Sequence, residues 1–147
     1  MIYYPQFKSL CEKVVDEMGA TRPGSTLAVS MIVAHESKGG TYLKQVGSGI
    51  ALGVIQMEKP THSDTWLHSD HIKRLSNKMG IRENFAALEY DLRYNIFMAR
   101  VRLMMDTKPL PTDPHDMAVY LKSYWNSDSG KATPEKYLND FHSWVGV

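Results

Sequence analysis

Hydrophobic side chains recur at helical spacing along most of the chain. The stripe over residues 7–18 follows the intervals i, i+3, i+4, i+7, i+8 and i+11, which predicts an amphipathic helix that ends near Gly19. Residues 26–37 are apolar around nearly the whole helical circumference, which predicts a buried helix with Ser25 or Thr26 as its N-cap. The longest periodic stretch, residues 85–105, predicts a central helix of about 18 residues.

Shorter patterns predict further helices and one irregular segment. A short helix is expected to begin at Pro60, and others at residues 70–79, 115–124 and 134–144. Residues 39–53 are small, glycine-rich and weakly alternating, so we expect a loop or a short, poorly formed hairpin whose backbone can approach a ligand closely. The sequence shows neither repeats nor parallel βαβ alternation. The expected fold class is therefore mainly α, in a single compact domain over residues 1–147.

Composition and charge argue against several classes of protein. The chain is 43% hydrophobic and 22% charged, which is typical of a soluble globular protein. Seventeen Lys and Arg against 16 Asp and Glu give a net charge of +1, and the basic residues are dispersed, so nucleic-acid binding has little support. The sequence contains no apolar run of membrane-spanning length and no visible signal peptide. The single Cys11 precludes an internal disulfide and lies on the first apolar stripe.

Glu36 is an ionisable residue at the end of the predicted buried helix. It is followed by Ser37 and then by Gly39 and Gly40. Burial disfavours the charged form of a carboxyl group, so a Glu in this place tends to stay protonated near neutral pH. Glu36 is therefore the strongest candidate for a general acid in this chain.

A second group of candidate residues follows the glycine-rich segment. Gly53 stands seventeen residues after Glu36 and opens the sequence Gly53-Val54-Ile55-Gln56-Met57. A buried acid at a helix end, a glycine-rich crossing and a turn that carries Gln56 would together build one wall of an extended cleft. Glu-Ser followed at this separation by Gly-hydrophobic-hydrophobic-Gln resembles the soluble lytic transglycosylase and goose-type lysozyme group of peptidoglycan-cleaving enzymes.

The resemblance implies a lysozyme-like helical fold and a set of site residues. The family's catalytic acid corresponds to Glu36, with Ser37 supporting the site. The substrate-binding residues implied by the family's motifs are Ser37, Gly53, Gln56, Met57, Thr61, Tyr124 and Asn126. The last two come from Tyr124-Trp125-Asn126, which resembles the family's Ala-Tyr-Asn-Ala-Gly segment with Trp125 standing between the Tyr and the Asn, so that either Tyr124 or Trp125 takes the place of the family's Tyr. Residues 127–130 complete that segment.

The implied reaction is cleavage of the β-1,4 bond between N-acetylmuramic acid and N-acetylglucosamine in peptidoglycan, with Glu36 as general acid and base. A lytic transglycosylase is the first expectation. A muramidase would need a second carboxylate to assist water, for which Glu58 and Asp64 are the candidates. A noncatalytic virion or tail module of the same fold is the third reading, and its partners would be phage virion components.

The expected site of action is the periplasmic cell wall. Because no signal peptide is visible, delivery by a phage particle or release during host lysis is expected.

The imidazole- and carboxylate-rich stretch comprises His62, Asp64, His68, Asp70 and His71. It has no HExxH frame and no accompanying Cys, so polar helix surface is the better interpretation. No metal and no cofactor are expected.

Overall fold

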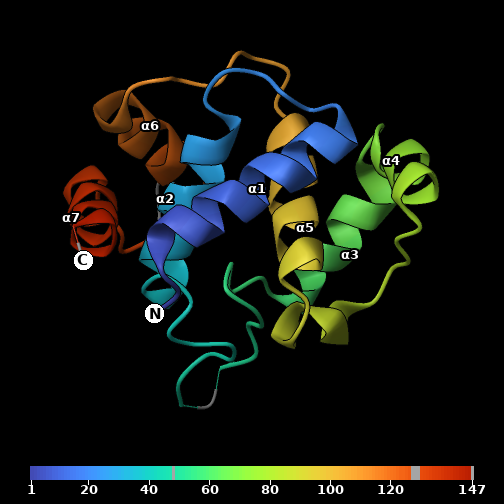
Figure 1. Ribbon diagram of the computed structural model, residues 1–147. Helices are drawn as coiled ribbons and strands as arrows, with labels where there is room; N and C mark the ends of the chain where they lie inside the picture. Colours follow the sequence, from blue (N-terminus) through green and yellow to red (C-terminus); the bar gives the residue numbers. More distant parts are fainter. Residues whose placement is uncertain (48, 127–129, 147) are drawn as a thin grey trace.

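The fold is mainly α. The computed structural model describes residues 1–47, 49–126 and 130–146, and no β-strand occurs in these ranges (Figure 1). The α-helices are α1 (Tyr4–Met18), α2 (Ser25–Ser37), α3 (Lys59–His68), α4 (Ile72–Met79), α5 (Leu92–Met104), α6 (Pro114–Leu121) and α7 (Pro134–Val145). A 3₁₀-helix η1 (Phe85–Glu89) precedes α5, and a π-helical turn η2 (Lys122–Asn126) follows α6. In the part of the chain described, no helix is both long and apolar enough to cross a membrane.

Helix α2 lies at the centre of the molecule. It packs against α1, α5, α6 and α7, and every side chain from residue 28 to residue 34 is buried (Figure 1). This confirms the buried helix predicted from its apolar circumference. The N-cap is Gly24, with φ 88°, and not Ser25 or Thr26. The Ser25 hydroxyl instead donates to the carbonyl of Arg22, at 2.6 Å, so it stabilises the preceding turn.

The prediction of one helix over residues 85–105 is wrong, because the chain leaves the helical conformation between η1 and α5. The Asp91 side chain caps α5 by accepting a hydrogen bond from the Tyr94 amide, at 3.0 Å. The side-chain amide of Asn95 donates to the carbonyls of Leu88 and Asp91, both at 2.8 Å. The Asp91 cap and the Asn95 bond to Leu88 take the place of backbone bonds that a continuous helix would make, whereas the Asp91 carbonyl also accepts from the Asn95 backbone amide.

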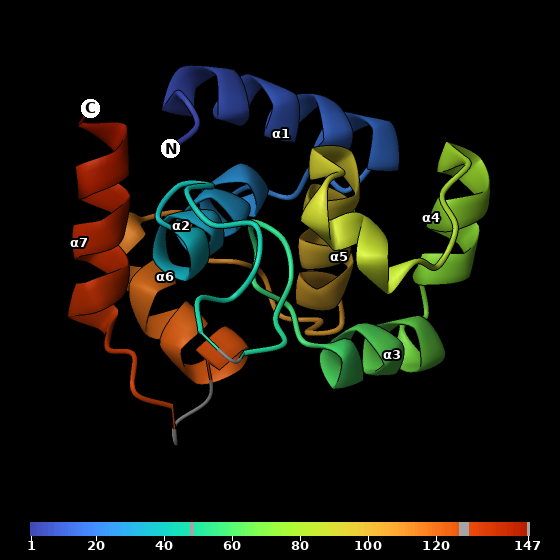
Figure 2. The ribbon, with the colours of Figure 1, turned by 90° about the horizontal axis from the view of Figure 1, so that it is seen from below.

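The other predicted elements are found close to their expected bounds. Helix α1 ends at Met18 with Gly19 as its C-cap, α4 ends at Met79 with Gly80 as its C-cap, and α7 begins at Pro134. The described residues 39–47 and 49–53 form a loop with isolated antiparallel bridges, one pairing Lys44 with Leu52. In Figure 2 this loop runs across the region between α2 and α3. It therefore lies beside the C-terminal end of α2, where the candidate acid is found.

Residues near both ends of the chain hold the turn that follows α2. The Ile2 amide donates to the Gly39 carbonyl at 2.8 Å, and the Trp144 indole donates to the Ile2 carbonyl at 2.7 Å. Gly39 has φ 69°, and a Cβ at this position would lie 2.7 Å from the Trp144 ring. Only glycine fits both this left-handed conformation and this contact. The turn beyond Glu36 is thus fixed by α7 and the segment before α1.

Candidate functional site

Glu36 occupies the last turn of α2, and the residues after it shape the helix end. The Ser37 hydroxyl donates to the carbonyl of Val33, at 3.1 Å, and accepts from the amide of Gly40, at 3.0 Å. Lys38 follows in the left-handed conformation, with φ 53°. Ser37 is fully buried by these contacts. Its place in the structure is therefore that of a residue supporting the turn, with no side-chain surface open to a substrate.

Burial raises the pKa of Glu36 to about 7. The side chain is partly buried at the end of an apolar helix, and the described residues offer its carboxyl group neither a hydrogen bond nor an ion pair that would favour the charged form. Desolvation therefore acts on it without compensation. A carboxyl group with this pKa is present in both its acid and its base form near neutral pH, as acid–base catalysis requires.

Tyr137 of α7 is a neighbour of Glu36 that the sequence did not single out. Burial and the negative charge of Glu36 both raise the pKa of Tyr137. Its hydroxyl is the buried side-chain polar atom without a hydrogen-bond partner in the described part of the chain. The Tyr137 ring also packs on His35, with centroids 4.1 Å apart, and His35 pairs with Asp140 at 2.9 Å. Helix α7 thus holds the end of α2 through aromatic and polar contacts.

The turn over residues 53–57 is built by glycine conformation and close packing. Gly53 has φ 83°, and a Cβ there would lie 2.2 Å from Oδ1 of Asn95 and 2.4 Å from the carbonyl of Leu88. Gln56 also has a positive φ, of 46°, and its side-chain amide donates to the Gly53 carbonyl at 2.9 Å. Gly53 is therefore a packing and turn residue, while Gln56 faces the groove described next.

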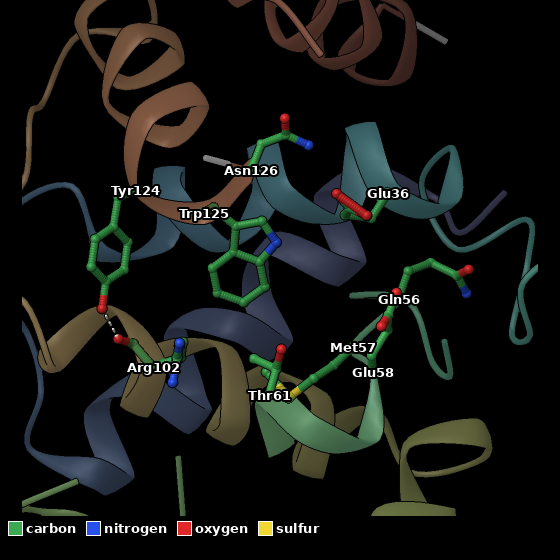
Figure 3. Close-up of a pocket in the computed structure, with 9 residues that line it drawn as sticks. All are labelled: Glu36, Gln56, Met57, Glu58, Thr61, Arg102, Tyr124, Trp125 and Asn126. Atoms are coloured by element: carbon green, nitrogen blue, oxygen red, sulfur yellow. Dashed lines mark hydrogen bonds between the residues drawn. The ribbon is translucent and has the colours of Figure 1, made fainter. Parts of the chain in front are cut away.

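Two pockets meet at Glu36. The first has a volume of about 310 Å³ and the second about 390 Å³, and they share Glu36, Gln56 and Glu58. The first is lined in addition by Met57, Thr61, Arg102, Tyr124, Trp125 and Asn126 (Figure 3). The second is lined in addition by Tyr42, Gln45, Val46 and Ala51. Together they form an extended groove with the candidate acid between its two halves, which suits a chain-like ligand.

The structure brings most of the predicted site residues together. Six of the predicted residues line the first pocket with Glu36: Gln56, Met57, Glu58, Thr61, Tyr124 and Asn126. Ser37, Gly53 and Asp64 line neither pocket. Gly53 and Ser37 are buried and support the turns beside the groove. Residues 127–129, which complete the segment containing Tyr124 and Asn126, lie outside the described residues.

Asp64 does not face Glu36 as a candidate second carboxylate should. Its carboxylate pairs with Arg102 at 2.6 Å and with His68 at 2.9 Å. The hydrogen bond from Arg102 is the main cause that lowers the pKa of Asp64. Asp64 is therefore a surface acid engaged with its neighbours, and Glu58 is the second carboxylate on the groove.

Six lining residues complete the groove beyond the predicted ones: Tyr42, Gln45, Val46, Ala51, Arg102 and Trp125. Arg100 and Arg102 both interrupt the apolar end of the periodic stretch, so the sequence pattern alone does not indicate which of the two reaches the groove. Tyr42 and Gln45 lie in the irregular segment, where no periodicity indicates which side chains point inward. Trp125 stands inside the predicted Tyr-Asn motif, and Figure 3 shows its indole in the middle of the first pocket's lining.

The described residues contain no group of three or more His, Cys, Asp or Glu that could hold a metal ion. Comparison of the chain with protein-family models, with curated proteins and with solved structures finds no match. A proposal of function therefore depends on the sequence motifs and on the geometry of the groove.

Proposed function

We propose that this protein cleaves the β-1,4 bond between N-acetylmuramic acid and N-acetylglucosamine in peptidoglycan, with Glu36 as general acid and base. The observation that carries the proposal is the position of Glu36, a desolvated carboxyl group with a pKa of about 7 between the two halves of an open groove. A glycan strand lying along the groove would present a glycosidic bond to this group. The acid form of Glu36 donates its proton to the bond's oxygen while positive charge develops at the anomeric carbon.

The first choice among the two chemical outcomes is lytic transglycosylation. After donating its proton, Glu36 acts as base for the C6 hydroxyl of the muramic acid, which attacks its own anomeric carbon and gives a 1,6-anhydro product. This reaction needs a single carboxyl group. The pKa of about 7 supports such a double role, because both protonation states of Glu36 are accessible at neutral pH.

Hydrolysis is the second candidate, and the position of Glu58 favours it. Glu58 lines both pockets together with Glu36, so its carboxylate shares the groove with the acid. An inverting glycosidase places its two carboxyl groups roughly 6.5 to 9.5 Å apart with a water molecule between them. Glu58 would then activate that water in place of the sugar hydroxyl.

The arrangement of the helices supports a lysozyme-like reading of the fold. A buried central helix carries the acid at its C-terminal end, and a glycine turn with Gln56 faces it across the groove. The π-helical turn η2 holds one residue more than an α-helical turn would, and Trp125 lies within it. This supports Trp125 as an extra residue between the Tyr and the Asn of the family's segment.

The test is turbidity clearing of purified peptidoglycan by the wild type and by Glu36→Gln. The wild type should clear the suspension, with a rate that falls as pH rises above about 7 because the acid form of Glu36 is lost. Glu36→Gln should fold normally and lose activity by about 100-fold or more. Mass spectrometry then separates the outcomes, since transglycosylation leaves anhydro ends and hydrolysis leaves reducing ends.

Glu58→Gln is the matched variant, because its side chain lies on the same groove. Glu58→Gln should retain activity if the products carry anhydro ends, because transglycosylation needs only Glu36. It should lose activity if the products carry reducing ends, because Glu58 would then activate the water. Equal activity of the wild type and Glu36→Gln would refute the catalytic role. A folded wild-type protein that binds peptidoglycan without cleaving it would instead support a noncatalytic virion or tail module.

A further inference from the structure

Arg102 brings a positive charge into a groove that otherwise carries acids. Of the described residues that line the two pockets, Glu36 and Glu58 are the carboxylates and Arg102 is the cation. Arg102 lies on the side of the first pocket opposite Glu36, below Tyr124 and Trp125 in Figure 3. An anionic substituent on a bound ligand would be repelled near Glu58 and near the ionised form of Glu36, and attracted at this end of the groove.

The guanidinium of Arg102 is held in place by hydrogen bonds that involve only one of its nitrogens, Nη1, among the described residues. Nη1 donates to the Asp64 carboxylate at 2.6 Å and to the Thr65 hydroxyl at 3.3 Å, and it lies 3.6 Å from the sulfur of Met105. Nε and Nη2 make no hydrogen bond with the described residues. The edge formed by these two nitrogens is the one that binds a carboxylate through two parallel hydrogen bonds.

Neighbouring residues fix the backbone and leave room beside the guanidinium. The Tyr124 hydroxyl donates to the carbonyl of Arg102, which ties η2 to the end of α5 (Figure 3). The Trp125 indole lies next to this pair and presents an apolar face in the first pocket. One end of the groove thus combines a flat aromatic surface, which is suited to a sugar ring, with a guanidinium group. Two of its nitrogens, Nε and Nη2, make no hydrogen bond with the described residues.

We propose that Arg102 binds a carboxylate of the substrate at this end of the groove and so selects acidic glycan units over neutral ones. The proposal rests on the proposed function, because it assigns a muramic acid unit, or its peptide, to the half of the groove that contains Trp125. In peptidoglycan the carboxylate has two sources. It belongs to the lactyl group where the glycan is free of peptide, and to the stem peptide where the glycan is substituted.

The test is equilibrium binding to the inactive Glu36→Gln protein, which needs no turnover. The probes are a peptide-free muramic acid tetrasaccharide, its lactyl methyl ester, and the same tetrasaccharide carrying a stem peptide or the methyl-esterified stem peptide. A carboxylate probe should bind about tenfold or more tightly than its ester, and Arg102→Gln should abolish this difference. Preference among the lactyl pair identifies the peptide-free glycan, and preference among the stem-peptide pair identifies the peptide.

Two control variants separate the guanidinium from its ion pair. Asp64→Asn removes the ion pair and keeps the cation, so it should retain or increase the preference for the carboxylate. Arg93→Gln removes another α5 arginine, which pairs with Glu17 at 2.8 Å outside both pockets, and should change nothing. Equal affinity for acid and ester in both pairs, an undiminished preference in Arg102→Gln, or no binding of any probe would overturn the proposal.

The two proposals fail in different ways. Carboxylate-dependent binding through Arg102, with no cleavage of peptidoglycan by the wild type, would refute the enzymatic function and leave the carboxylate site standing. Cleavage by the wild type, with acid and ester probes bound equally well, would refute the carboxylate site and leave the role of Glu36 standing.

Discussion

Replacing Glu36 by Gln should make the protein more stable above neutral pH and leave its stability nearly unchanged at pH 4. Burial raises the pKa of Glu36 from its ordinary value of 4.5 to about 7 in the folded protein. The folded state therefore binds the proton more tightly than the unfolded state does. Stability contributed by the protonated form is fully present below pH 4.5 and is lost as pH rises through about 7.

The magnitude follows from the two pKa values. Each pH unit between them corresponds to roughly 1.4 kcal/mol, so full ionisation of Glu36 lowers the free energy of unfolding by roughly 3 kcal/mol. A Gln side chain is close in shape to the protonated acid and has no charge to desolvate. The difference in stability between Glu36→Gln and the wild type should therefore grow from near zero at pH 4 to about 3 kcal/mol at pH 8.

The assay is urea denaturation of both proteins at several pH values between 4 and 8. Subtracting the two curves cancels the titration of groups that the proteins share. Glu58→Gln is the control, because Glu58 lies on the same groove with an exposed side chain, and it should change the free energy of unfolding by about 0.5 kcal/mol or less. A difference between Glu36→Gln and the wild type that stays constant from pH 4 to pH 8 would show that Glu36 is not desolvated, and the assignment of the acid would lose its physical basis.

Three other substitutions test the surroundings of the acid. Gly53→Ala should lower the free energy of unfolding in urea by roughly 3 kcal/mol or more, because the new Cβ would lie 2.2 Å from Asn95. Gly80→Ala, with a similar φ and open space around it, should lose only roughly 1 to 2 kcal/mol, and equal losses would contradict the packing argument. Tyr137→Phe should keep or slightly raise the thermal stability, since the hydroxyl has no hydrogen-bond partner among the described residues; a clear loss would reveal one. Trp125→Ala should weaken binding of a peptidoglycan fragment about tenfold in the catalytically inactive background, and unchanged affinity would mean that no sugar contacts the indole.

Sequence periodicity predicted the parts of the structure that local patterns determine. The apolar circumference of residues 26–37 correctly indicated a buried helix with Glu36 in its last turn, and with it the raised pKa of that residue. The same method missed the break before α5, because Leu88 and Leu92 continue one apolar stripe on either side of it. Asp91 is the local signal for the break, as an N-cap residue standing inside an apparently helical pattern.

Residues that meet only through packing could not be predicted in this way. Asp64 and Arg102 are separated by 38 positions, and their ion pair depends on how α3 lies against α5. Nothing in the sequence around Asp64 shows that its carboxylate is engaged there and not at the groove. Tyr137 is likewise one aromatic position among several in α7, and its proximity to Glu36 depends on the packing of α7 on α2.

The packing of α7 on the end of α2 also has a consequence for the order of events during synthesis. Three residues of α7 contact the end of α2. Tyr137 packs on His35, Asp140 pairs with His35, and Trp144 packs against Gly39 in the turn that follows. A nascent chain that has emerged only as far as α6 lacks these contacts, so the end of α2 that carries Glu36 would be more open to water. The raised pKa of Glu36 is therefore expected to depend on the docking of α7 as well as on the sequence of α2 itself.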